Sequence, residues 1–438
     1  MYGYPQLQSE RVAKILFITL SYPGCLHVNM AVAQAMARRG HEIAFYTSES
    51  ARYRVEGAGF ACFSFDPELQ AGFDHMVLSD DVMGGTLARM LRFRRYMRQA
   101  FVDTIPQQLA DLEGILRQWP ADLITCDPGI WGTFLILAQK RPDLPMILLS
   151  YIAGSTLPGP DAPPLGLGLP LPQNWRSRLL TWAGTRILNW YMSDVRGAAS
   201  KMRQQYGLSP FAGPVIKLAH DLPLFLIPSC PEFDYNRRDL PASVHYVGPL
   251  NWYPPLDPPV WLAELPRDRP WVHVTEASQH GQDPVVIRAT LQALADLPVQ
   301  VVFTTVATRD PAELGLGQLP ANAVGAKWIN YDQLLPLVDV VICTGGSGTI
   351  LTCLQHGIPV IAIPTWDHGD NAQRLVQVGA GLRLDPAHFT PESIRRAVQT
   401  VLTDSTYREN ARRIAPFLNR LGGPERAADL IEQVLSPH

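Results

Sequence analysis

A cluster of glycines in the C-terminal half of the sequence is the first candidate for binding chemistry. Gly345, Gly346 and Gly348 stand in TGGSGT, between a strand-like run at 338–344 and a helix-like run that Gly357 ends. Glycines let a ligand approach the backbone closely, and the N–H groups of a helix's first turn attract an anion. A diphosphate fits such a turn, although a plain strand–helix turn that needs glycine for packing is the alternative.

A polar loop follows the next strand-like run, at 359–364. It contains Asp367, His368, Asp370 and Asn371. In parallel sheets ligands bind beyond the carboxyl ends of the strands, where this loop and the glycine turn would both emerge. A carboxylate and an imidazole do not attract a diphosphate, but they can hydrogen-bond to the hydroxyls of a sugar attached to it. We therefore expect phosphates at the glycines and a sugar at the polar loop.

Strand-like and helix-like patterns alternate along the whole chain. Apolar runs of strand length occur at 14–20, 42–47, 122–126 and 146–150, and a second set occurs at 271–275, 299–305, 338–344 and 359–364. Alternation of this kind predicts parallel sheets joined by crossover helices. The proline-rich segment 247–270 between the two sets indicates a stiff linker. We predict an α/β protein with two doubly wound, Rossmann-like parallel-sheet domains that face a cleft.

The composition is that of an ordinary globular protein. The chain has 438 residues, 47% of them hydrophobic, and a formal net charge of −3, which gives no indication of nucleic-acid binding. Its six cysteines show no metal-type spacing and are expected to be reduced thiols. We see neither a signal peptide nor an apolar run of membrane-spanning length. A cytoplasmic location is expected, and peripheral contact with a membrane is left open.

Two stretches allow more than one interpretation. Residues 89–101 carry five arginines among aromatic residues, which favours a solvated helix face over a phosphate or membrane-surface patch. Residues 175–191 place Leu179, Ala183, Ile187, Trp190 and Tyr191 on one helical face. Such a stripe favours the core, although it could also line an apolar pocket or touch a bilayer.

Two long segments resemble one enzyme family. TGGSGTILTCLQHGIPVIAIPTWDHGDNAQRLVQVGAGLRL is similar to the donor-binding signature of glycosyltransferase family 1. These nucleotide-sugar-dependent enzymes include the UDP-glucuronosyl and UDP-glucosyl, macrolide and carotenoid glycosyltransferases. ILFITLSYPGCLHVNMAVAQAMARRGHEIAFYTSES resembles the opening of the family's acceptor domain. The resemblance runs from Lys14 to about Leu435.

The resemblance implies the two-domain fold called GT-B. It implies an acceptor domain at 1–246, a linker at 247–270, a donor domain at 271–422 and a last helix at 423–438 that crosses back to the first domain. The reaction implied is an inverting, metal-independent transfer of a hexose. It needs no cofactor besides the UDP- or TDP-linked sugar as co-substrate.

Site residues are implied by position. Carried over from the family, the diphosphate would be bound by Ser278, Thr344, Gly345, Gly346, Ser347, Gly348 and Thr349. Trp328 would stack on the nucleobase, and Asp367 and His368 would bind the sugar. No metal ligand is implied.

His27, in HVN after the first strand, matches the family's catalytic base. A hydroxyl of very high pKa needs a base when it attacks an anomeric carbon, and an imidazole serves near neutral pH. Asp127, at the end of another strand, matches the partner acid that would orient the imidazole. A capping or structural role is the alternative for an isolated histidine or aspartate.

Three positions depart from the family's pattern. Thr344 replaces a histidine, Thr352 replaces a carboxylate that binds the ribose, and His368 stands where glutamine is common. These departures bear on the identity of the donor more than on the fold.

The expected acceptor is an apolar molecule with a hydroxyl group, such as a macrolide or other polyketide, a carotenoid, a flavonoid or a sterol-like compound. The acceptor loops would lie within residues 60–100 and 150–205. One rival is a catalytically silent nucleotide-sugar-binding or partner-activating protein of the same fold, which would not need both His27 and Asp127. Another is a sugar-nucleotide epimerase or hydrolase, which would not need the long apolar region.

Overall fold

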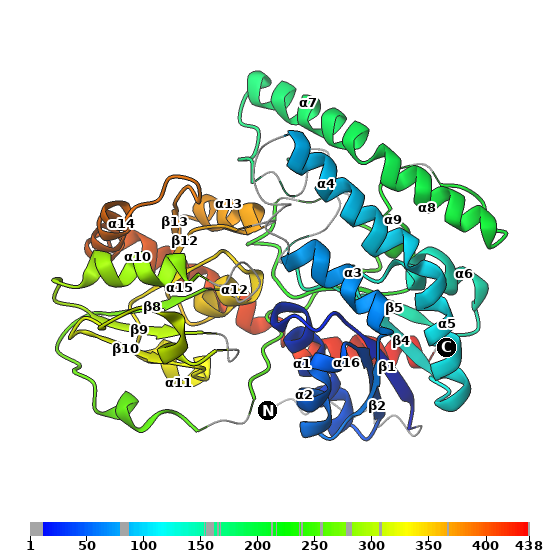
Figure 1. Cartoon of the computed structure of the whole chain (residues 1–438), viewed down its shortest axis with the longest axis horizontal. Coiled ribbons are helices and arrows are strands. Elements are labelled where there is room, and N and C mark those ends of the chain that lie inside the picture. The colour runs from blue at the N-terminus through cyan, green and yellow to red at the C-terminus, as the bar shows by residue number, and fades with distance from the viewer. Residues whose placement is uncertain are drawn as a thin grey trace.

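Two α/β domains make up the protein (Figure 1). The computed structural model describes residues 12–78, 87–152, 154, 162–163, 166, 168–211, 213–215, 217–235, 237, 240–254, 257–276, 283–305, 309–365 and 368–436. Each domain holds one sheet, and every paired strand within it is parallel. The predicted fold class is therefore confirmed.

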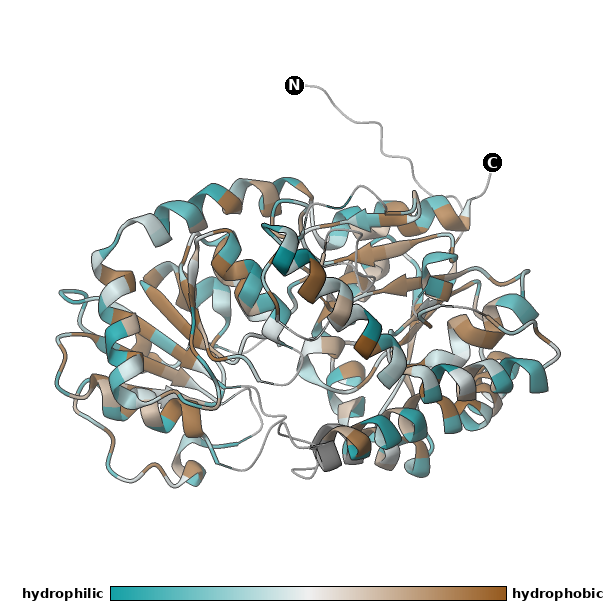
Figure 2. Cartoon of the chain, turned by 90° about the horizontal axis from the view of Figure 1, so that it is seen from above, coloured by the Kyte–Doolittle hydropathy of each residue, from teal (hydrophilic) through white to brown (hydrophobic). Residues whose placement is uncertain are grey.

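The N-terminal domain contains a seven-stranded sheet in the order β3-β2-β1-β4-β5-β6-β7. The central strands β4 and β5 are buried at every residue, as expected for a parallel sheet covered on both faces. Figure 2 shows the apolar character of the strands in both domains. The strands are β1 (Lys14–Ile18), β2 (Glu42–Thr47), β3 (Ala61–Ser64), β4 (Leu123–Cys126), β5 (Met146–Leu149), β6 (Phe225–Ile227) and β7 (Val244–Tyr246).

The helices of this domain alternate with its strands. They are α1 (Pro23–Arg38), η1 (Glu49–Ala51), α2 (Arg52–Gly57), α3 (Pro67–Leu78), α4 (Leu87–Arg98), η3 (Gln99–Asp103), α5 (Ile105–Gln118), η4 (Thr133–Leu137), α6 (Ala138–Lys140), α7 (Trp175–Tyr191), α8 (Ser193–Gln205) and α9 (Lys217–His220). The 175–191 segment is helical, but none of its residues is buried. The expectation that its apolar stripe belongs to the core is wrong, because the stripe faces outward.

The C-terminal domain contains a six-stranded sheet in the order β10-β9-β8-β11-β12-β13. Its strands are β8 (Trp271–Thr275), β9 (Gln300–Thr304), β10 (Ala323–Ala326), β11 (Val340–Cys343), β12 (Val360–Ala362) and β13 (Gly381–Arg383). Its helices are α10 (Val285–Leu294), η6 (Pro311–Leu314), α11 (Tyr331–Leu334), η7 (Leu335–Leu337), α12 (Ser347–Gln355), α13 (Gly369–Gln377), α14 (Pro391–Thr403) and α15 (Thr406–Arg420).

The last helix, α16 (Pro424–Leu435), packs on the N-terminal domain. Ala427, Ala428 and Ile431 are buried in the same apolar cluster as residues of β1 and α1. Arg39, at the end of α1, pairs with Glu425, Asp429 and Glu432 of α16. The chain therefore crosses between the domains twice, in the segment after β7 and again before α16.

The segment after β7 is in contact with both domains. Leu250 and Trp252 are buried in the cluster around β1, whereas Leu262 is buried in the cluster around β11. Its described part contains a 3₁₀ turn, η5 (Val260–Ala263), in the stretch where the proline content predicts no regular structure. Short 3₁₀ turns tolerate proline at their start, and Pro259 stands directly before this one.

Candidate active site

The glycine turn lies between β11 and α12, as the sequence predicts. Gly345 has a φ of +82°, a backbone conformation that L side chains rarely adopt. A Cβ atom added there would lie 3.1 Å from the His368 Cβ and 3.3 Å from the Pro364 Cβ. Both the conformation and the close packing therefore require glycine. The turn then places Gly346 at the N-cap of α12, and no side chain of the described residues caps that helix.

The space in front of α12 is open and lined with hydrogen-bond donors. No described atom lies within 4 Å of a Cβ added to Gly348, and only the His368 Cε1, at 3.9 Å, does so for Gly346. The Ser347 hydroxyl is buried, and no described group forms a hydrogen bond with it. Because the first N–H groups of a helix have no partner within the helix, this end of α12 can bind an anion.

The predicted polar loop is partly helical: Asp370 and Asn371 belong to the first turn of α13, and His368 is its N-cap. This end of α13 contacts the glycine turn. The His368 Nδ1 lies 2.8 Å from the Thr344 carbonyl oxygen, and the Asn371 Nδ2 donates to the Gly345 carbonyl at 3.1 Å. A carbonyl only accepts, so the Nδ1 of His368 carries the hydrogen, and its Nε2 is an acceptor when the ring is neutral. The structure thus joins His368 to the predicted diphosphate site. Asp367 and Ser278 lie outside the described residues.

Asp370, in the first turn of α13, binds the other domain. Its two carboxylate oxygens accept from the Gly166 N–H at 2.6 Å and from the Gly168 N–H at 2.7 Å. The Arg383 guanidinium donates to the Gly168 carbonyl at 2.6 Å. Gly166 and Gly168 of the N-terminal domain are therefore held by the donor domain beside the predicted sugar site.

Trp328 lies at the boundary between the two domains. Its ring is nearly parallel to that of Tyr331, at 7° with 6.4 Å between centroids, and it meets the His27 ring edge-on at 5.6 Å. The Thr349 hydroxyl lies near the Tyr331 phenol and partly opposes the rise in its pKa that burial causes. The predicted nucleobase residue and the predicted base are thus neighbours.

Thr352 is occupied by contacts with the linker. Its buried hydroxyl lies 2.7 Å from the Gly348 carbonyl oxygen and 2.9 Å from the Asn251 Oδ1. The Asn251 Nδ2 in turn donates to the Gln355 Oε1 at 2.9 Å. The position where the family has a ribose-binding carboxylate therefore joins α12 to the interdomain segment.

His27 lies on α1 between two tryptophans. Its ring centroid is 5.1 Å from that of Trp252 in the linker, and Trp328 lies on the donor-domain side. Burial and, to a smaller extent, the positive charge of Arg54 together lower the pKa of His27 to about 3. The imidazole is therefore neutral across the physiological range and can accept a proton.

Asp127 is buried directly after β4, and its carboxylate is hydrogen-bonded to the backbone that follows the neighbouring strand, β1. Its Oδ2 accepts from the Leu20 N–H at 3.1 Å and its Oδ1 from the Gly129 N–H at 2.7 Å. Burial raises the pKa of Asp127 to about 6, although these N–H groups oppose the rise. Neither a hydrogen bond nor an ion pair joins Asp127 to His27 in the described part of the chain. The expectation that Asp127 orients the His27 imidazole stays a prediction.

Sequence reasoning missed the residues that join the domains at this site. They are Trp252 and Asn251 in the linker and the buried ion pair between Asp234 and Arg374. For Asp370, the sequence predicts a place in the polar loop but not its contact with the N-terminal domain. A pattern confined to one segment does not reveal these contacts, since each partner lies in a different domain or linker.

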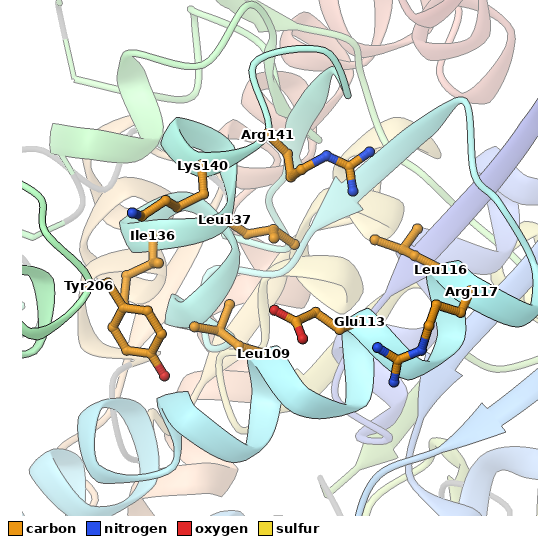
Figure 3. A pocket seen from close by; sticks show the side chains of 9 residues that line it. All are labelled: Leu109, Glu113, Leu116, Arg117, Ile136, Leu137, Lys140, Arg141 and Tyr206. Atoms are coloured by element: carbon orange, nitrogen blue, oxygen red, sulfur yellow. The ribbon is translucent and has the colours of Figure 1, made fainter.

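A cavity of about 500 Å³ lies elsewhere, in the N-terminal domain (Figure 3). Apolar side chains line it together with Glu113, Arg117, Lys140 and Arg141. None of its lining residues belongs to the predicted site. Among the described residues, no group of three or more His, Cys, Asp or Glu side chains is arranged to hold a metal ion.

Comparison with known proteins identifies the family. Residues 288–428 match the model of the erythromycin biosynthesis protein CIII-like C-terminal domain. The 4'-demethylrebeccamycin synthase of Lentzea aerocolonigenes is 32% identical over 438 residues, which cover 96% of this chain and 99% of that protein. The chain belongs to the nucleotide-sugar-dependent GT-B glycosyltransferases. It is thus related to sugar-transferring enzymes of antibiotic biosynthesis.

Solved glycosyltransferases share the fold along nearly the whole chain. The calicheamicin glycosyltransferase CalG4 is 25% identical with a TM-score of 0.71, and the match covers 97% of this chain and 98% of that one. SsfS6 of Streptomyces sp. SF2575, solved with thymidine diphosphate, has a TM-score of 0.67 at 21% identity, with 96% and 99% covered. The second likeness shows the fold alone.

Proposed function

We propose that the protein is an inverting glycosyltransferase that moves a hexose from a UDP- or TDP-sugar to a hydroxyl group of an apolar small molecule. The observation that carries the proposal is the contact between His27 and Trp328 across the domain boundary, 5.6 Å between ring centroids. A base from the acceptor domain then lies beside the residue expected to stack on the nucleobase. The uncapped start of α12 belongs to that same donor domain.

The proposed reaction is a single displacement. A ring nitrogen of His27 takes the proton of the acceptor hydroxyl while its oxygen forms a bond to the anomeric carbon. The bond from that carbon to the diphosphate oxygen breaks on the opposite side, which inverts the configuration. The nucleoside diphosphate leaves as an anion, and it needs no proton donor because it is already a good leaving group.

We infer that residues of the chain offset the charge of the leaving diphosphate without a metal. The N–H groups at the start of α12 and the Ser347 hydroxyl would donate to its oxygens, and the helix dipole adds a favourable potential. The Nε2 of neutral His368 is an acceptor and would bind a sugar hydroxyl. The Thr352 hydroxyl is already hydrogen-bonded within the protein. At this position, therefore, no carboxylate would bind the hydroxyls of the ribose.

Two observations favour the rival, a catalytically silent donor-binding protein. No hydrogen bond joins His27 to Asp127 among the described residues, and the His27 pKa of about 3 makes it a weak base in this structure. The enzyme is favoured because His27 presents a neutral imidazole beside the donor domain. The match to a glycosyltransferase over 96% of this chain supports it as well. The relative's name refers to rebeccamycin, which agrees with an apolar natural product as acceptor.

Incubation with a panel of sugar donors decides between the enzyme and the catalytically silent protein. UDP-glucose and TDP-glucose would each be mixed with pooled hydroxylated polyketides, flavonoids and sterols, and glycosylated products sought by mass spectrometry. The enzyme yields a glycoside whose anomeric configuration, read by NMR, is opposite to that of the donor. Binding of nucleotide by calorimetry without any product from the pools would favour the silent protein.

A further inference from the structure

Most of the exposed large hydrophobic side chains lie on two helices. Of the thirteen such side chains among the described residues, eight belong to α4 and α7. On α7 they are Trp175 at 70% exposed, Leu179 at 54%, Leu180 at 69%, Trp182 at 56%, Ile187 at 62% and Trp190 at 71%. At 3.6 residues per turn, these six positions fall within an arc of about 160°. The helix therefore turns its apolar face to the outside.

α4 continues this surface. The two helices run beside one another at the edge of the N-terminal domain (Figure 1). The Tyr191 phenol at the end of α7 donates to the Met90 carbonyl of α4, and the Arg94 guanidinium lies 5.9 Å from the Tyr191 ring centroid. Met90 and Leu91 are exposed as well. We call the exposed side chains of α4 and α7 the arginine–aromatic ridge.

The ridge is positively charged. The segment 175–191 contains three arginines and the segment 87–98 contains five, and neither contains an acidic residue. Arg176 lies over the Trp175 ring at 5.4 Å and Arg186 over the Trp182 ring at 4.9 Å. Within the described part of the chain, Arg176, Arg178 and Arg186 form no ion pair. This concentration of positive charge contrasts with a chain whose net charge is −3.

We infer that the arginine–aromatic ridge binds the surface of an anionic phospholipid bilayer. Tryptophan and arginine are the side chains that suit the headgroup region, where an apolar ring and a cation are both accommodated. Clustered cations attract anionic lipids, and the apolar arc of α7 enters the boundary between headgroups and acyl chains. The helix lies on the surface, since no helix of the described residues is long and apolar enough to span a membrane.

A second copy of the chain fits the ridge less well. Two copies that meet by the same face would place the arginines of one ridge against those of the other. Those charges would repel because neither α4 nor α7 contains an acidic residue. An anionic bilayer supplies the opposite charge along the whole ridge.

The ridge also lies near the domain boundary. The Gly168 N–H donates to Asp370 of the donor domain, and α7 begins seven residues later at Trp175. Seven extended residues span at most about 25 Å, which limits the distance from that contact to the start of the ridge. An acceptor dissolved in the bilayer would therefore be close to the domain boundary when the ridge is bound.

Vesicle flotation with the full chain tests the inference. We expect the protein to float with phosphatidylcholine vesicles that contain phosphatidylglycerol, to float far less with phosphatidylcholine alone, and to be released by salt. The double variant Arg176→Glu with Arg178→Glu should bind anionic vesicles at least about 30-fold more weakly, since each arginine near the surface contributes about fivefold and the new glutamates are repelled. Trp175→Ser with Trp190→Ser should weaken binding to the same vesicles without changing its salt dependence.

Matched controls test whether vesicle binding depends on the ridge itself or only on the overall charge and hydrophobicity of the protein. Arg396→Glu with Arg413→Glu reverses two exposed arginines of the donor domain, and Val260→Ser removes an apolar side chain that is 81% exposed. Neither should change flotation, and sedimentation velocity should give the same mass for wild type and the tryptophan variant. Equal loss of binding in the control double variant would overturn the inference. A dimer that dissociates when Trp175 and Trp190 are replaced would overturn it in favour of a second copy.

Discussion

Asp234 and Arg374 form a buried ion pair between the two domains, with 3.1 Å between the Asp234 Oδ1 and the Arg374 Nε. The Tyr246 phenol donates to the other carboxylate oxygen, and the Arg374 guanidinium lies 4.5 Å from the Tyr235 ring centroid. A Cβ atom at Gly154 would come within 2.5 Å of the Arg374 Nη2 and of the Asp234 Oδ1, so glycine is required there. These contacts fix α13, and with it the polar loop, against the N-terminal domain.

Removal of one partner should therefore be costly. Asp234→Ala leaves the Arg374 cation buried without its counter-charge and should destabilise the fold by about 3–5 kcal/mol. Tyr246→Phe removes one hydrogen bond to the same carboxylate and should cost less, about 1.5–3 kcal/mol, because the ion pair remains. Urea unfolding followed by circular dichroism measures both. Equal, small effects of the two substitutions would show that the pair does not hold the domains together.

The start of α12 should be a site for the diphosphate. A Cβ atom added at Gly346 meets no described atom closer than 3.9 Å, so Gly346→Val should fold but fill the space in front of the helix. We expect binding of UDP and TDP to fall below detection in calorimetric titration. Gly197→Ala, at a glycine of α8 with no atom within 4 Å of the added Cβ, is the control and should bind normally. Undiminished binding by a folded Gly346→Val protein would contradict the site.

The donor nucleotide should be poorly discriminated. Thr352 stands where the family has a carboxylate, and its hydroxyl is hydrogen-bonded to Gly348 and Asn251. This position therefore offers no carboxylate to the ribose diol, which UDP has and TDP lacks. We expect kcat/KM for UDP-glucose and TDP-glucose to differ by less than about tenfold, or ~1.4 kcal/mol. Matched kinetics measure the ratio. A preference of about a hundredfold for UDP would show that another residue binds the diol.

Asp127 should make stability depend on pH. Its folded pKa of about 6 lies above the ordinary value of 3.8, so the folded state holds its proton more tightly than the unfolded state. The stabilisation is fully present below pH 3.8 and is lost as the pH rises through 6, by about 3 kcal/mol in total. Asp127→Asn cannot ionise and should lack this slope, whatever its absolute stability. Unfolding free energies from pH 4 to 7 with identical slopes in both proteins would refute the assignment.

The central strands and the glycine turn could be predicted from sequence, because long apolar runs and TGGSGT are local signals. Five strands were not predicted, namely β3, β6, β7, β10 and β13. Each has three or four residues, and β3, β7, β10 and β13 lie at sheet edges. Such short segments carry too little periodicity to stand out from loops.

The helical stripe of α7 and the partners of Asp127 show a different limit. Periodicity predicts that one face of a helix is apolar, but it does not say whether that face meets the core or the outside. Likewise, the sequence places Asp127 at the end of a strand, but it does not reveal that the carboxylate accepts from the backbone N–H groups of Leu20 and Gly129. Which partner a buried carboxylate takes is decided by tertiary packing.

The His27→Ala variant tests the central claim most directly, through the rate of sugar transfer in a single turnover with saturating donor. If His27 is the base, the rate should fall by about 100-fold or more while the dissociation constant of the nucleotide stays within about threefold of wild type. Circular dichroism verifies the fold of the variant. Transfer at a near-normal rate by the folded variant would contradict the account.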